Sequence, residues 1–262
     1  MKKLAASTSF EFLDFGLAEP LPAEGDSLLS VKKDAFWSYC GPLLSKQDDL
    51  PPSIHEWTHA ALSSSILPVL LPFLTFVNEF VKANGLDNYW LTIRATKATV
   101  EYDRPRWHTD DMFFARSGGG NLQTDWKLCA TLLGPSTMFI PPEHQEAARS
   151  TSRTTKRALA TDHSCTSIRC VGCASTAEAV RDELSTKLTS LGLVQARPGE
   201  CSVFRIGQER GAVHSEPSMS HGDRIFVNVV PGKRDELAGL VSKWGMNFPR
   251  SWWIAPNMSH VS

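Results

Sequence analysis

Neither sign of charge predominates in this sequence, and long apolar runs are lacking. The 262 residues include 27 Lys and Arg against 28 Asp and Glu, which gives a formal net charge of −1. A chain without a basic excess has no global field to attract nucleic acid or anionic lipid, so we expect neither as a partner. The longest apolar run, residues 66–77, contains two prolines and is too short to cross a bilayer, so we expect no membrane span.

The first residues also lack the apolar stretch of an export signal, because polar and acidic residues follow Lys2 and Lys3 closely. We therefore expect a cytoplasmic protein whose six cysteines are thiols rather than disulfides. Apolar residues make up 42% of the chain, with 13 Phe and 8 Trp, which is enough to form a sizeable core. One domain is the expected organisation.

The spacing of apolar residues changes from helical to alternating near residue 88, which predicts helices before a set of strands. The expected helices are 54–65, 70–83, 176–191 and 235–244, and the expected strands are 89–102, 127–133, 137–140, 201–206, 212–215 and 224–230. The basic stretch 147–157, rich in Ser and Thr, is expected to be a loop.

This order predicts a mainly β fold with flanking helices, a sandwich or barrel rather than a βαβ array. Within the single domain we expect an N-terminal arm with helices in residues 1–88, a β core in 89–232, and a C-terminal helix and tail in 233–262.

Two short segments contain the residue types that bind a metal ion. His108 and Asp110 are two positions apart, so on a strand their side chains point to the same face. His214, from a later predicted strand, would complete a set of two imidazoles and one carboxylate. Such a set suits Fe(II) and leaves coordination positions open.

In these residues the sequence resembles the Fe(II)/2-oxoglutarate-dependent oxygenases, whose pattern is His-x-Asp/Glu, a distal His, and an Arg about ten positions later. Arg224 follows His214 by ten residues, and Trp107-His108-Thr109-Asp110 is most similar to the taurine dioxygenase branch. The resemblance covers residues 91–230 and implies a double-stranded β-helix core of the jelly-roll or cupin type.

The resemblance also implies the cofactors and the roles of individual residues. Fe(II) would be held by His108, Asp110 and His214, with 2-oxoglutarate and O2 as co-substrates. The distal carboxylate of 2-oxoglutarate would be bound by Arg224 and by a hydroxyl, for which Thr137, Ser136 and Thr131 are all candidates. Oxidation of a C–H bond would follow, by hydroxylation, desaturation or ring formation.

Residues next to the predicted ligands are candidates for contact with a small-molecule substrate. Trp107, Phe113 and Phe114 can form apolar walls, and Arg116 can meet an anionic group. The glycine-rich segment that follows, 117–125, is a candidate lid.

Two other classes of protein remain open. His55-Glu56-Trp57-Thr58-His59 matches the His-Glu-x-x-His signature of zinc peptidases, and Glu79 lies where a third zinc ligand could follow. A β-helix protein that binds a ligand without catalysis is the other alternative. Separately, a structural zinc ion could be bound by a compact group of thiols and one imidazole, formed by His163, Cys165, Cys170 and Cys173.

Overall fold

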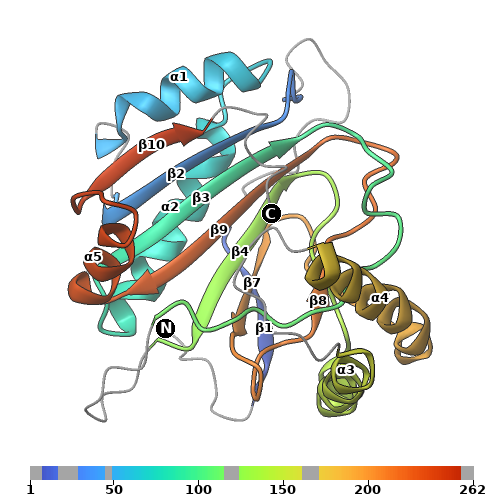
Figure 1. Ribbon diagram of the computed structural model, residues 1–262. Coiled ribbons are helices and arrows are strands. Elements are labelled where there is room, and N and C mark those ends of the chain that lie inside the picture. The colour runs from blue at the N-terminus through green and yellow to red at the C-terminus, as the bar shows by residue number, and fades with distance from the viewer. Residues whose placement is uncertain (1–7, 17–28, 45–48, 115–123, 161–170, 255–262) are drawn as a thin grey trace.

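The computed structural model describes residues 8–16, 29–44, 49–114, 124–160 and 171–254. Two antiparallel sheets and five α-helices make up this part of the chain (Figure 1). The strands are β1 (Phe10–Asp14), β2 (Ala35–Pro42), β3 (Asn88–Thr96), β4 (Trp126–Leu133), β5 (Met138–Phe139), β6 (Val194–Gln195), β7 (Glu200–Arg205), β8 (His214–Ser215), β9 (Arg224–Gly232) and β10 (Arg250–Ile254). The helices are α1 (Pro52–Ala61), α2 (Leu67–Ala83), α3 (Gln145–Leu159), α4 (Val171–Lys187) and α5 (Arg234–Ser242), and the short 3-10 helices are η2 (Pro142–His144) and η3 (Thr189–Leu191).

The larger sheet has seven strands in the order β1-β7-β4-β9-β3-β2-β10, and the smaller has three in the order β6-β5-β8. The prediction of a mainly β fold with flanking helices is therefore confirmed. The large sheet extends beyond the expected core of residues 89–232, because β1 and β2 come from the N-terminal part and β10 from the C-terminal part. No helix within the described ranges has the length and apolar character that spanning a membrane requires.

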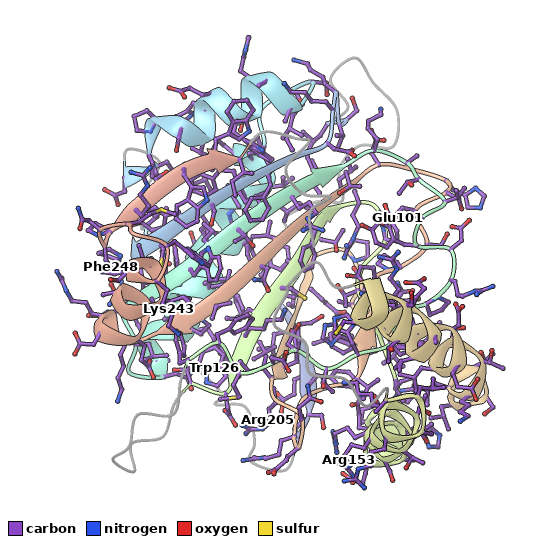
Figure 2. All side chains as sticks on the ribbon, viewed as in Figure 1. Glu101, Trp126, Arg153, Arg205, Lys243 and Phe248 are labelled. Carbon is purple, nitrogen blue, oxygen red and sulfur yellow. The ribbon has the colours of Figure 1, made fainter. Side chains whose placement is uncertain are left out.

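Each face of the large sheet has its own set of neighbours, because side chains alternate along a strand. Leu128 of β4 and Val227 of β9 belong to a core that also contains residues of α1 and α2, so these helices cover one face (Figure 1). The opposite face carries Phe204 of β7, which packs with Phe139 of the small sheet at a ring-centroid distance of 5.2 Å. The small sheet thus covers part of the second face, and side chains fill the space between the layers (Figure 2).

The segment predicted as a loop, 147–157, lies within helix α3, so that prediction is wrong. The buried residues of α3 are Gln145, Ala148, Arg149, Ser152 and Thr155, and their spacing places them on one face of the helix. Four of the five are polar, and a hydrophobic period is therefore absent from the sequence. Helix α3 is held by hydrogen bonds from this face: Arg149, for example, donates to the carbonyl oxygen of Gly211 at 3.2 Å.

The other predicted helices exist with shifted ends. Helix α2 ends where Asn84-Gly85 predicted, and Gly85 takes the positive φ of 75° that glycine tolerates. Helix α4 begins five residues before the predicted start at residue 176, and it ends at Lys187. The four described cysteines, Cys40, Cys129, Cys173 and Cys201, form no disulfide, as expected for thiols.

Candidate metal centre

His108 and His214 are brought together by the backbone. The N–H of each donates to the carbonyl oxygen of the other at 2.9 Å, which forms an isolated antiparallel bridge. The sequence predicted a strand at both positions, but only His214 lies in one, and it pairs with Phe139 of β5. The two imidazole rings are 4.4 Å apart between centroids.

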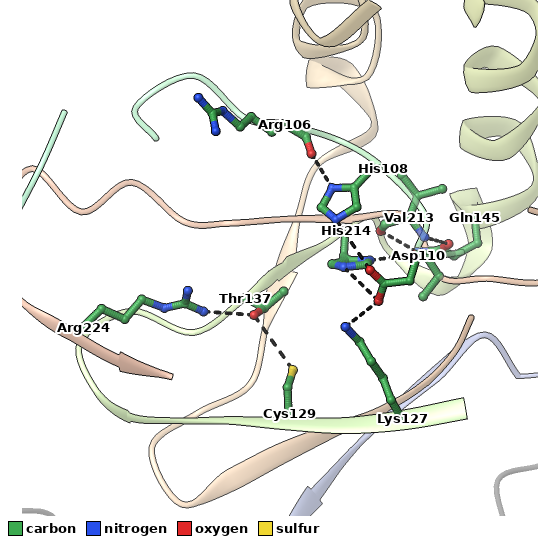
Figure 3. A network of polar contacts seen from close by, with 11 residues as sticks. Arg106, His108, Asp110, Lys127, Cys129, Thr137, Gln145, Val213, His214 and Arg224 are labelled. Carbon is green, nitrogen blue, oxygen red and sulfur yellow. Dashed lines mark hydrogen bonds and ion pairs between the residues drawn. The ribbon is translucent and has the colours of Figure 1, made fainter. Parts of the chain in front are cut away.

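Hydrogen bonds to the backbone orient both imidazoles (Figure 3). Nδ1 of His108 lies 2.7 Å from the carbonyl oxygen of Arg106, and Nδ1 of His214 lies 2.9 Å from that of Ala212. Since a carbonyl only accepts, each Nδ1 carries a proton, and the lone pair of the neutral ring is on Nε2. Metal-binding histidines are commonly oriented by such a bond to a carbonyl oxygen.

Both Nε2 atoms face the carboxylate of Asp110. Nε2 of His108 is 3.9 Å from Oδ1 of Asp110, and Nε2 of His214 is 3.7 Å from Oδ2. The two Nε2 lone pairs and the carboxylate are all electron-rich, and the distances between them are too long for hydrogen bonds. A cation between these groups would stabilise the arrangement. One ligand atom from each residue lies within 4.8 Å of the other two, and no other His, Cys, Asp or Glu group in the described ranges can hold an ion in this way.

A lysine that the sequence analysis missed, Lys127, contacts the carboxylate of this centre. Nζ of Lys127, on β4, lies 2.5 Å from Oδ2 of Asp110, and the lysine side chain is only 10% exposed. Burial would raise the pKa of the Asp110 carboxyl, but the Lys127 ammonium and the two imidazoles outweigh it and lower that pKa to about 2. Asp110 is thus held as a carboxylate. A lysine within an otherwise apolar strand, Trp126–Leu133, was the signal available in the sequence.

Burial also determines the state of His214, whose side chain is 7% exposed. Burial above all, together with the charges of His108 and Lys127, lowers the pKa of His214 to about 3. The ring is therefore neutral at physiological pH, as a metal ligand must be.

Arg224 is a buried cation near this centre. Its Nε donates to the carbonyl oxygen of Pro135 at 3.0 Å, and one terminal nitrogen donates to Oγ1 of Thr137 at 3.1 Å. Among the described residues no ion pair includes Arg224, and burial lowers its pKa to about 10. The neighbouring Asp223 faces elsewhere and accepts hydrogen bonds from the backbone N–H of Val31 and of Ala98.

Among the three candidate hydroxyls, Thr137 is the one in contact with Arg224, as Figure 3 shows. The chain reaches this position through Gly134, which has a φ of 82°, and a Cβ there would lie 2.3 Å from the carbonyl oxygen of Asp223. Glycine is therefore required at this turn, which brings Pro135 and Thr137 within hydrogen-bonding distance of the guanidinium.

Glu216 is a second charged residue that the sequence analysis missed. It follows His214 by two positions, and its Oε2 is buried without a hydrogen bond from any described residue. Burial works to raise the pKa of Glu216, but the imidazole of His108 and the positive charge of Arg224 contribute to lowering it overall. No spacing rule in the sequence distinguishes this glutamate from the many exposed ones.

The predicted substrate residues have different positions. Trp107 is buried and lines a cavity beside His108. Phe113 is half-buried, with its ring 5.9 Å from Nζ of Lys127. Phe114 is not at the metal centre as expected: it packs with Leu237 of α5. Phe114 also lies against Gly232, at the end of β9, on the side of the large sheet that α5 covers. Arg116 and most of the candidate lid lie outside the described residues.

The competing His-Glu-x-x-His motif assembles no site among the described residues. His55, Glu56 and His59 lie on the exposed side of α1, whose buried residues are Ile54, Trp57 and Ala61. Together with Glu79, which is exposed on α2, they form no group of converging ligand atoms. Of the residues proposed to bind structural zinc, Cys173 is exposed on α4, and His163, Cys165 and Cys170 lie outside the described residues.

No protein-family model matches this chain, and no curated protein sequence is significantly similar to it.

Proposed function

We propose that this protein is an Fe(II)- and 2-oxoglutarate-dependent oxygenase that oxidises a C–H bond of a small molecule. The observation that carries the proposal is the convergence of His108, Asp110 and His214, with both Nε2 lone pairs directed at one carboxylate. Two imidazoles and one carboxylate suit Fe(II) and leave positions for a chelating co-substrate and O2.

The charges around the centre support both proposed ligands. Asp110 and Glu216 are negative, and Lys127 and Arg224 are positive, so the four side chains sum to zero. A divalent cation alone would leave two uncompensated positive charges in a largely buried site, which is costly. A dianion such as 2-oxoglutarate restores neutrality, and Arg224 is a buried cation that forms no ion pair with a described residue.

The residues have distinct roles in this proposal. His108, Asp110 and His214 would hold the ion, and Lys127 would keep the second oxygen of Asp110 neutralised. Arg224 has five N–H donors, of which the described residues accept two, so a distal carboxylate can be bound by the others with help from the Thr137 hydroxyl. When bound, the metal and co-substrate supply oxidation by O2: substrate, O2 and 2-oxoglutarate give hydroxylated product, succinate and CO2.

A double-stranded β-helix core of the jelly-roll type is part of the same proposal. One support is that the small sheet packs against one face of the large sheet. The other is the position of the candidate ligands: His214 lies in β8, and His108 pairs with it through an isolated β-bridge. In this arrangement Lys127 of β4 reaches the metal centre from the large sheet, while His214 comes from the small sheet.

Anaerobic absorption spectroscopy tests the proposal. Fe(II) followed by 2-oxoglutarate should produce a visible charge-transfer band, because the keto acid chelates the metal. His108→Ala should abolish the band, and Arg224→Met should raise the concentration of 2-oxoglutarate needed by about tenfold or more, because charge-assisted hydrogen bonds are lost.

His55→Ala is the matched control and should leave the band unchanged, because His55 is exposed on α1. A wild-type protein without a band would overturn the proposal in favour of ligand binding without catalysis. Metal binding that depends on His55 and His59 instead would favour the peptidase alternative.

A further inference from the structure

A cavity of about 450 Å³ opens beside the candidate metal centre, and His108 forms part of its wall. Its other walls come from α3, α4 and the segment that carries Trp107. These two helices lie side by side near β8 (Figure 1). The volume is in the range of pockets that bind small organic molecules.

The walls of this cavity are largely apolar. Trp107, Ala160, Ala177 and Val180 line it, and the side chains of Trp107 and Val180 belong to one buried cluster. Apolar walls favour a ligand with a hydrocarbon or aromatic body, because its surface leaves water on binding.

Two cations, Lys156 and Arg181, also line the cavity. Arg181 is partly neutralised by Glu178, with 3.1 Å between the paired atoms. Lys156 donates to a neutral acceptor, Oε1 of Gln208 at 3.4 Å, and within the described ranges it forms no ion pair with a carboxylate. The cavity therefore combines an apolar wall with a positive charge that no described carboxylate pairs.

We infer that this cavity is the substrate site and that it takes an amphipathic organic anion, a carboxylate with an apolar body. The charge of Lys156 binds the carboxylate, and the wall formed by Trp107 and Val180 binds the body. The anion's position beside His108 presents its C–H bonds to the metal centre. Only this last point, that the ligand is oxidised, rests on the proposed function; binding does not.

The test uses the metal-free protein and octanoate, with octylamine as a probe of the same length and opposite charge. Calorimetry should detect octanoate binding and at least tenfold weaker octylamine binding. Lys156→Met should weaken octanoate binding about tenfold, which is the change expected for a lost charge-assisted hydrogen bond. Ala177→Trp should abolish it by filling the cavity.

Arg157→Met is the matched control, because it removes one positive charge from the same helix at a residue that does not line the cavity. It should leave octanoate affinity unchanged. Cys173 also lines the cavity, so octanoate should slow its alkylation by iodoacetamide in the wild type but not in Lys156→Met.

Equal binding of octanoate and octylamine, or equal weakening by Lys156→Met and Arg157→Met, would overturn the inference. The two proposals fail separately. A charge-transfer band without octanoate binding would contradict only the inference that this cavity is the substrate site. Octanoate binding without a band would contradict only the proposal that the protein is an oxygenase.

Discussion

At the scale of single residues, Lys127 is the counter-charge that allows Asp110 to remain ionised in a largely buried site. The side chains are 10% and 18% exposed, so water compensates neither charge well. Removing one partner of such a pair leaves the other charge buried and unpaired, which is far more costly than losing a pair at the surface.

Lys127→Met should therefore lower the free energy of unfolding of the metal-free protein by about 3 kcal/mol. Fe(II) should recover much of this loss, because the ion replaces the missing positive charge beside Asp110. Urea denaturation under nitrogen, with and without Fe(II), measures both effects.

Lys187→Met is the control, since Lys187 pairs with Glu183 at the surface and the change should cost less than about 1 kcal/mol. A loss in Lys127→Met as small as in this control would show that Lys127 does not compensate Asp110.

At the scale of elements, helix α3 holds the strand that carries His214. Nε2 of Gln145, the first residue of α3, donates to the carbonyl oxygens of Ile140 at 2.6 Å and of Val213 at 3.2 Å. Its Oε1 accepts from the backbone N–H of Val213 at 2.7 Å. One side chain thus satisfies both backbone groups of the residue before His214.

Gln145→Met keeps the length of this side chain but removes all three hydrogen bonds. We expect a loss of about 2 to 3 kcal/mol in the free energy of unfolding, because the buried N–H of Val213 loses the acceptor that Gln145 provides, while the Val213 carbonyl keeps its bond from the N–H of Ile140. Metal affinity should fall by about tenfold or more, since the position of His214 depends on this contact. Urea denaturation and Co(II) titration measure the two effects.

Gln195→Met, at an exposed glutamine of the same small sheet, should change neither quantity appreciably. Weakened stability with unchanged metal affinity in Gln145→Met would mean that α3 supports the fold but does not position the imidazole.

At the scale of the whole molecule, the candidate ligands join two distant parts of the chain. His108 and Asp110 precede β4, whereas His214 follows β7, and Lys127 comes from the large sheet. An ion bound by His108, Asp110 and His214 joins these two parts and binds only the folded chain, so it shifts the folding equilibrium by mass action.

Fe(II) at 100 times its Kd should stabilise the protein by about 2.7 kcal/mol. For a chain of this size that corresponds to a rise in Tm of about 5 to 10 °C, which anaerobic thermal unfolding can measure. His214→Ala should remove the rise and His59→Ala should retain it, because His59 is exposed on α1. The reverse dependence would place the metal at the helix.

Local patterns in the sequence determined which residues are candidates and which segments fold as most of the helices and strands. The interval between His108 and Asp110, the ten residues from His214 to Arg224, and the stop at Asn84-Gly85 all depend on neighbours in the chain. Strand alternation and helix termination act over a few residues, so a sequence displays them directly.

Only the tertiary structure decided what surrounds those candidates. The polar face of α3 is buried because its hydrogen-bond partners lie far along the chain, such as Gly211 for Arg149. Lys127 and Glu216 belong to the site for the same reason, and Phe114 lies outside it because it packs with Leu237 of α5. Pairing across strands brings together groups that no local period connects, and it therefore determines the charge, burial and cavity of the site.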